Sequence, residues 1–303
     1  MPHFLPMENT PKTIVILGPT ASGKSALAIE IARKYNGEII SVDSRQVYRG
    51  MDIGSGKVTK AEQKQAKHYL LDVVDPNTDY NVTDFLRDAS VAETAIRDQG
   101  KTPIFCGGTG FWMQAYMEHQ SFPGVKPNPE LREKLRAYPV DELFALVASK
   151  DPRRAETIDR KNPLRLIRAL EIIEVLGAVP EVDHVKIKNE NYTIFALNPD
   201  KKKLEIKIRH RLKERFKQGM VQEVENLLKA GVSYKRLEAL GLEYKYIAIF
   251  LQKKMRRNDM EVELLREILR YVKRQMTWLR RMETQGWEIH WIKDISETTS
   301  FLK

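Results

Sequence analysis

Glycine, lysine and serine occur at fixed spacing near the start of the chain, in Gly18-x-x-x-x-Gly23-Lys24-Ser25. Glycine-rich loops of this pattern turn backbone N–H groups around phosphate oxygens, and the following helix adds the positive end of its dipole. Lys24 is expected to reach the terminal phosphate and the Ser25 hydroxyl to ligate Mg²⁺. The pattern predicts a phosphate site formed by Gly18, Pro19, Thr20, Ala21, Ser22, Gly23, Lys24 and Ser25.

A carboxylate, Asp43, directly follows the apolar run GEIISV (37–42). In open parallel sheets, ligands bind outside the carboxyl ends of the strands, so we expect Asp43 near the mouth of the phosphate loop. There it would ligate a metal or accept a proton from a nucleophile. The alternative for an aspartate at this place is to cap a turn. The turn GGTG (107–110) also has two possible interpretations, because its glycines permit either a close ligand or a plain tight turn.

The apolar pattern predicts the elements that position these residues. Buried strands are expected at 13–17, 37–42, 68–76 and 102–110. Helices are expected between them, at 24–35 and 81–100. This alternation is typical of the α/β class, with a parallel sheet covered on both faces.

The rest of the chain has a different sequence pattern. Residues 115–185 lack strand signals, and helical segments follow prolines, at 129–137, 140–149 and 163–176. A strand is expected at 192–197. Helices are expected after it at 204–229 and 261–283, and an edge strand at 286–292. We therefore predict a core in two parts with a helical insertion between them, at 11–116, 189–303 and 117–188.

Composition narrows the possible classes. Lys and Arg exceed Asp and Glu by 51 to 41, and this net charge of +10 favours a polyanionic partner. The single cysteine, Cys106, excludes an intrachain disulfide and is expected in the core. No apolar run approaches the roughly 18 residues that span a bilayer. The N-terminus MPHFLPMENTPK lacks a signal-peptide pattern and is expected to be a disordered lead-in. We expect a cytoplasmic protein.

Two functions remain open at this point. A kinase that moves a γ-phosphoryl group to a small acceptor uses a loop of this kind, and so does a nucleic-acid-dependent ATPase. The spacing of the glycines and the lysine does not separate them.

Six segments, in this order, resemble the tRNA dimethylallyltransferases, also called tRNA isopentenyl transferases: GPTASGKS, DSRQVYRGMDIGSGK, HYLLDVVDP, PIFCGGTGFW, NPLRLIRALEI and RYVKRQMTWLRR. The resemblance covers roughly residues 11–292, and DSRQVYRGMDIG is its most specific part. It implies transfer of a dimethylallyl group from dimethylallyl diphosphate to N6 of adenosine 37 in tRNA, with Mg²⁺ required and diphosphate as the leaving group. It also implies a P-loop NTPase/kinase-like parallel sheet core, an all-helical insertion that grips the anticodon stem-loop, and a helical C-terminal part. We expect a monomer.

The resemblance further implies roles for individual residues. Asp43 would hydrogen-bond the adenine N6 and take its proton, Thr20 would lie close to the reacting groups, and Lys24 would stabilise the charge that grows on diphosphate. Arg211 and Arg215 match an arginine pair of the family in the helix after the insertion. We assign one or both of them to the diphosphate, and the alternative is that they belong to a solvated helix face. The residues that resemble the family's tRNA contacts are Asp43, Ser44, Arg45, Gln46, Thr109, Arg132, Leu164, Arg165, Leu166, Ile167 and Arg168.

Three segments depart from the family pattern. SGKV (55–58) stands where Thr-Gly-Lys-Pro is usual, and GGTGFW (107–112) replaces Gly-Gly-Thr-Gly-Leu-Tyr. ALGLEYKY (239–246) replaces Gly-Tyr-(Lys/Arg) and is expected to insert residues into a loop that contacts tRNA. The zinc finger of eukaryotic relatives is absent from this sequence, which favours the compact bacterial-type form.

Overall fold

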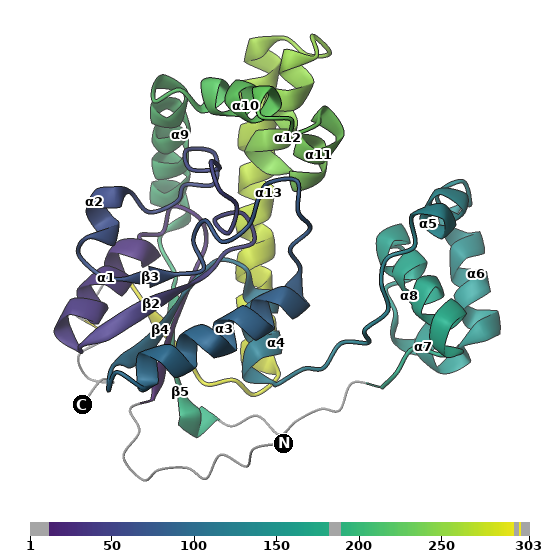
Figure 1. Cartoon of the computed structure of the whole chain (residues 1–303), viewed down its shortest axis with the longest axis horizontal. Helices are drawn as coiled ribbons and strands as arrows, with labels where there is room; N and C mark the ends of the chain where they lie inside the picture. Colours follow the sequence, from purple (N-terminus) through teal and green to yellow (C-terminus); the bar gives the residue numbers. More distant parts are fainter. Residues whose placement is uncertain (1–11, 182–188, 294–296, 298–303) are drawn as a thin grey trace. The chain divides into compact units, whose positions relative to one another are not determined.

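The computed structural model describes residues 12–181, 189–293 and 297 (Figure 1). The chain divides into two compact units: Met1–Glu118 with Lys186–Lys303, which we call the core unit, and His119–Val185, which we call the helical unit. The predicted lead-in at 1–11 and the expected end of the insertion at 188 lie outside the described residues.

The core unit contains a parallel sheet, which in the described part of the chain has six strands in the order β3-β2-β4-β1-β5-β6. The strands are β1 (Thr13–Leu17), β2 (Gly37–Val42), β3 (His68–Tyr69), β4 (Thr102–Gly107), β5 (Tyr192–Leu197) and β6 (Ile289–Ile292). In the central register, Ile14 lies opposite Ile104 on one side and Thr193 on the other. The predicted α/β class is confirmed.

Both faces of the sheet are buried, which explains why its strands read as continuous apolar runs. Ile14 and Ile16 pack against helix α1 (Lys24–Lys34), together with Cys106, whose predicted place in the core is confirmed. Val15 and Leu17 point to the other face, where they share a core with α3 (Val82–Arg97) and α4 (Gly110–Met117). The two-residue period of the strands therefore supplies two separate apolar layers.

The prediction of one strand over 68–76 is wrong beyond Tyr69. Leu70 and Asp72 adopt φ angles of 61° and 56°, which lie outside the β region. Val74 forms an isolated parallel bridge to Tyr48, outside the strands of the sheet. The segment therefore continues as irregular chain beside the carboxyl edge of the sheet, where it can line a site.

The predicted single helix over 204–229 is also wrong, because it is two helices, α9 (Lys201–Lys217) and α10 (Met220–Lys229). Gly219 between them has a φ of 96°, a left-handed conformation that ends the first helix. Figure 1 shows α9, α10, α11 and α12 gathered around one end of the long α13.

The expectation of a lengthened loop at 239–246 is corrected as well. These residues join two helices, α11 (Tyr234–Leu240) and α12 (Leu242–Leu251), at Gly241. The remaining elements of the core unit are α2 (Lys60–Gln63), a short 3₁₀ turn at Asn189–Asn191, and α13 (Arg257–Thr284). In the described part of the chain, no helix is both long and apolar enough to span a membrane.

The helical unit has its own core. Its helices are α5 (Pro129–Arg136), α6 (Val140–Lys150), α7 (Pro152–Thr157) and α8 (Pro163–Leu176). Asn128 and Asn162 cap α5 and α8, each with its side-chain oxygen accepting a backbone N–H and with proline at the first helical position. Leu143, Val147 and Leu166 are among the buried residues that hold the helices together.

Candidate functional site

The glycine-rich loop lies between β1 and α1, at the carboxyl edge of the sheet. Gly23 has a φ of 99° and Ala21 a φ of 63°, so the loop turns through left-handed conformations before the helix begins. Lys24 folds back over the loop, and its Nζ donates to the carbonyl oxygen of Pro19 at 3.3 Å. The predicted phosphate loop therefore has the strand and helix that it requires.

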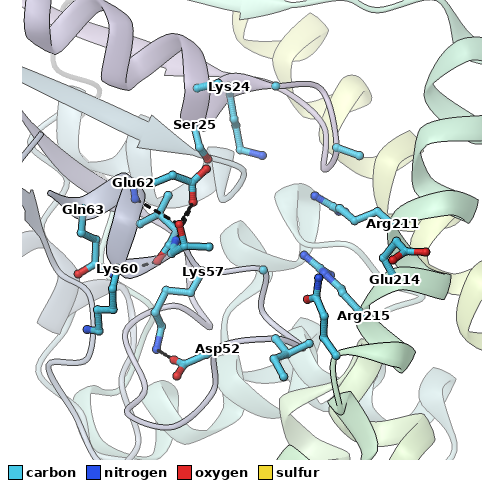
Figure 2. Close-up of a pocket in the computed structure, with 18 of the residues that line it drawn as sticks. Lys24, Ser25, Asp52, Lys57, Lys60, Glu62, Gln63, Arg211, Glu214 and Arg215 are labelled. Atoms are coloured by element: carbon cyan, nitrogen blue, oxygen red, sulfur yellow. Dashed lines mark hydrogen bonds and ion pairs between the residues drawn. The ribbon is translucent and has the colours of Figure 1, made fainter. Parts of the chain in front are cut away.

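Arg211 and Arg215 reach toward this loop from α9 (Figure 2). Arg211 donates a hydrogen bond to Oγ1 of Thr20. Arg215 is 8% exposed and donates to the carbonyl of Gly54 at 3.3 Å and to Oε1 of Glu243 at 3.2 Å. Arg211 thus contacts the loop directly, and Arg215 lies one helical turn further along α9. That they bind the diphosphate stays a prediction.

The positive charges of Lys24, Arg211 and Arg215 are buried close together and repel one another. Burial lowers the pKa of Lys24, and Arg211 and Arg215 lower it further. Burial and the neighbouring Arg215 lower the pKa of Arg211 to about 9, so its guanidinium still carries a charge at pH 7. Crowded cations of this kind gain most when an anion binds among them.

Two cavities meet at the loop. The first has a volume of about 690 Å³ and includes Ser25, Lys57, Glu62 and Arg211 in its lining. Figure 2 shows the two arginines on one side of this cavity and Ser25 and Glu62 on the other. The second has a volume of about 380 Å³, and its lining residues include Thr20, Asp43, Glu243, Tyr246, Tyr271 and Gln275. Lys24 and Arg215 line both cavities, so the cations stand where the two spaces adjoin.

Asp43 both caps a turn and faces the second cavity. Its Oδ1 accepts the backbone N–H of Arg45 at 2.8 Å and that of Gln46 at 3.3 Å, which fixes the chain as it leaves β2. Thr109, from the turn after β4, accepts the N–H of Ser44 at 3.3 Å. The structure thus confirms the capping alternative, and it places the same carboxylate in the lining of a cavity beside the cations. That Asp43 ligates a metal or accepts a proton stays a prediction.

The glycines of the GGTG turn serve contacts within the protein. A Cβ at Gly107 would overlap the carbonyl of Val42, and one at Gly108 would overlap the side-chain amide of Gln275. A Cβ at Gly110 would press into the ring of Trp278. Of the two alternatives left open for this turn, the structure shows close contacts of the glycines with the chain itself.

Arg45 and Gln46 also have partners in the core unit. Arg45 donates from Nε to the carbonyl of Leu240 at 2.5 Å, and Gln46 donates from Nε2 to the carbonyl of Gly56 at 3.3 Å. These bonds tie the turn after β2 to the neighbouring loops. That the two residues contact tRNA stays a prediction.

The predicted tRNA contacts of the helical unit divide by exposure. Leu166 and Ile167 are 0% and 4% exposed, so their side chains pack in the core of this unit rather than on its surface. Leu164 is 72% exposed, and Arg165 is exposed beside it. The prediction of surface contacts is therefore corrected for the two buried side chains and stands for their exposed neighbours.

The two other arginines of this unit that were predicted to contact tRNA, Arg132 and Arg168, bond a buried carboxylate. Arg132 donates to Glu171 at 2.8 and 2.9 Å, and Arg168 donates to Glu171 at 3.2 Å and to the carbonyl of Val125 at 2.7 Å. Burial of Glu171 opposes its ionisation, but hydrogen bonds from Arg132 and from the Asn128 N–H hold its pKa below the usual range. Arg132 and Arg168 therefore stabilise the unit.

Sequence reasoning missed three residues of the site. Glu243 pairs with Arg215, and burial raises the pKa of this glutamate. Tyr271 lines the second cavity, and burial with the charge of Asp43 raises its pKa to about 12. Gln275 bonds the phosphate loop itself. One signal was available for Gln275, since a polar residue at a buried position of an apolar helix face is unusual.

Comparison with known proteins now identifies the family. The sequence model of the IPP transferase family matches residues 46–282, and that of the isopentenyl transferase family matches residues 11–76. The chain belongs to the IPP transferase family. The resemblance stated from the motifs is thereby confirmed.

Relatives within the IPP transferase family match nearly the whole chain. A protein of Geotalea uraniireducens (strain Rf4), named tRNA dimethylallyltransferase 1, is 40% identical over 285 residues, 92% of each chain. One of Treponema denticola, named tRNA dimethylallyltransferase 2, is 40% identical over 295 residues, 95% of this chain and 98% of its own. The crystal structure of the full-length tRNA isopentenylpyrophosphate transferase of Bacillus halodurans superposes with a TM-score of 0.71 at 31% identity, over 96% of this chain and 95% of that one.

Proposed function

We propose that this member of the IPP transferase family is a tRNA dimethylallyltransferase that moves a dimethylallyl group from dimethylallyl diphosphate to N6 of adenosine 37 of tRNA. One observation carries the proposal at the site: Lys24 and Arg215 line both cavities, so an anion site adjoins the space that Asp43 faces. The names of the relatives agree with this reaction and lend no support to a small-molecule kinase or a nucleic-acid-binding ATPase.

In this proposal the glycine-rich loop holds a leaving group. When the bond between C1 of the donor and its oxygen breaks, negative charge grows on the diphosphate. Lys24, Arg211 and Arg215 stabilise that charge, and their crowding favours the state in which the charge is largest. The diphosphate is then released.

Asp43 acts on the acceptor. Its Oδ1 already accepts two backbone N–H groups, and this anchors the carboxylate in the wall of the second cavity. The other oxygen, Oδ2, takes the proton that N6 loses as the bond between N6 and C1 forms. An exocyclic amine is a weak nucleophile, so holding it against C1 supplies much of the rate.

The donor set fits Mg²⁺. This ion keeps several waters and is commonly held by one or two protein oxygens with substrate phosphates. Ser25 supplies such an oxygen in the first cavity, whereas no group of three or more His, Cys, Asp and Glu in the described part of the chain suits a metal. Bound there with the diphosphate, Mg²⁺ would neutralise charge on the leaving group.

The helical unit is proposed to contact the anticodon stem-loop through exposed residues such as Leu164 and Arg165. Six basic residues of α13 are exposed and would extend the basic surface of the core unit: Arg266, Arg270, Lys273, Arg274, Arg280 and Arg281. The proposal includes a monomer, which agrees with one chain lining both cavities. It also includes a location in the cytoplasm, which agrees with tRNA as the substrate.

The test is a transfer assay with dimethylallyl diphosphate labelled in the prenyl group and tRNA that lacks the modification. We expect label in the tRNA, on the adenosine next to the anticodon after nuclease digestion and chromatography. Label that never reaches the tRNA, together with turnover of ATP, would support one of the two alternatives instead.

A further inference from the structure

Gln275 is a polar residue on the buried face of an otherwise apolar helix stripe. It is 7% exposed, and the other buried side chains of α13 are apolar: Met260, Leu264, Ile268, Leu279 and Met282. A buried amide costs free energy unless its donors and acceptors are paired. Packing alone would therefore place a leucine or a methionine at this position.

The amide of Gln275 joins two loops of the site. Its Oε1 accepts the backbone N–H of Thr20 at 3.0 Å, and its Nε2 donates to the carbonyl of Gly108 at 3.0 Å. One partner is a donor and the other an acceptor, so the amide has only one suitable orientation. Gly108 must lack a side chain for this contact, because a Cβ there would overlap Nε2.

We propose that Gln275 is a positioning residue for prenyl transfer: it holds the Thr20 segment of the phosphate loop at a set distance from the Gly108–Thr109 turn. The inference rests on the proposed function. Through Thr20, the amide governs the phosphate side of the site, since the hydroxyl of Thr20 accepts a hydrogen bond from Arg211. Through the Gly108–Thr109 turn, it governs the acceptor side, since Thr109 accepts the N–H of Ser44, next to Asp43.

The consequence for the reaction follows from this connection. Without the amide, the diphosphate cations and Asp43 keep their chemical groups but lose the link that sets their spacing. A misplacement of about 1 Å between reacting groups costs on the order of 10²-fold in rate. Binding of the donor depends on the summed charge of Lys24, Arg211 and Arg215 and changes much less.

The experiment measures kcat and KM for the donor in Gln275→Met, which has a similar length but neither hydrogen bond. Gln114→Met is the matched control. Gln114 is also 7% exposed, but it bonds Glu118 at 2.7 Å and Gln285 at 3.0 Å, away from both loops. Thermal unfolding of each variant shows whether the two losses of stability are comparable.

We expect Gln275→Met to lower kcat about 10- to 100-fold with KM for dimethylallyl diphosphate within about threefold of wild type, and Gln114→Met to leave both within about twofold. Gly108→Ala should lower kcat similarly, because it disrupts the hydrogen bond between Gln275 and Gly108 at the Gly108 end. The double variant should lose little more activity than either single variant. Gln275→Glu keeps the acceptor but adds a negative charge, so it should also raise KM.

Several results would overturn the assignment: a Gln275→Met enzyme with kcat within twofold of wild type, a kcat no lower than that of Gln114→Met, or fully multiplicative losses in the double variant. If Gln275→Met does not fold, Gly108→Ala and Gln275→Glu decide by the same criteria. A wild-type protein that transfers no label overturns the proposed function and this role together, whereas an active wild type with unaffected variants overturns only the role.

Discussion

Replacing Asp43 by asparagine separates the turn cap that this carboxylate forms in the structure from its proposed role as a general base. Oδ1 of Asp43 accepts the N–H groups of Arg45 and Gln46, and an asparagine oxygen can accept both. The turn after β2 should therefore keep its conformation in Asp43→Asn. The variant cannot take a proton from N6, so the loss of transfer reports the chemical task alone.

The expected magnitude follows from general base catalysis, which contributes about 10²- to 10⁴-fold. We expect the single-turnover rate of Asp43→Asn to fall by at least about 10²-fold, a loss of roughly 2.7 kcal/mol in transition-state stabilisation. The free energy of unfolding should change by less than about 1 kcal/mol, because the hydrogen bonds of the turn persist. Asp43→Ala should lose the same rate and about 1 kcal/mol more stability, since its cap is gone.

Donor binding gives an independent check. The charge of Asp43 raises the pKa of Lys24, so the two groups interact. Removing a negative charge near the anion site should leave the affinity for diphosphate unchanged or slightly tighter, as calorimetry can measure.

The assay follows transfer of labelled prenyl groups to tRNA at saturating donor, with thermal unfolding in parallel. Asp200→Asn is the matched control, because Asp200 is also a capping carboxylate, which accepts the N–H of Lys203 at 2.9 Å at the start of α9, and it lines neither cavity. A folded Asp43→Asn enzyme that retains more than about a third of the wild-type rate would refute the proposed role of Asp43.

Three further predictions test the surroundings of the site. Gly56→Ala should lower the free energy of unfolding by about 1–3 kcal/mol and raise the donor KM, because Gly56 has a φ of 63° and a Cβ there would overlap Arg215. Gly100→Ala controls for backbone strain alone, since Gly100 has a φ of 67° and open space around it. Equal effects of the two substitutions would contradict the argument. Arg211→Gln should raise the donor KM, because it removes a cation that donates a hydrogen bond to Thr20 of the phosphate loop; a KM equal to that of wild type would show that this cation is not needed. Glu171→Gln should lower the free energy of unfolding of the helical unit by about 2 kcal/mol, since charged hydrogen bonds from Arg132 and Arg168 are lost. Hydrogen exchange in α5 and α8 should become faster. Unchanged exchange would show that the pairing adds no stability.

The core elements were predictable because their signals are local. A fully buried strand reads as an unbroken apolar run, and the glycine-rich loop carries its own spacing, so β1, β2, β4 and the loop were found nearly to the residue. The helices at 129–136, 140–150 and 163–176 were likewise predictable, because prolines are followed there by segments with helical apolar spacing. At 68–76 the apolar composition persists while the backbone turns at Leu70 and Asp72. At 204–229 apolar residues at helical spacing lie on both sides of Gly219, where the backbone turns.

By itself, the sequence determined that a phosphate loop precedes a helix, that Asp43 ends a strand of the same sheet, and that the family motifs occur in order. Only the tertiary structure decided that Asp43 caps its turn while lining a cavity, that Arg215 pairs with Glu243, and that Leu166 and Ile167 are buried. It also decided that the amide of Gln275 bonds Thr20, a residue 255 positions away. A pattern of spacing reports neighbours along a helix or strand, whereas such contacts form only when distant segments pack against the same edge of the sheet.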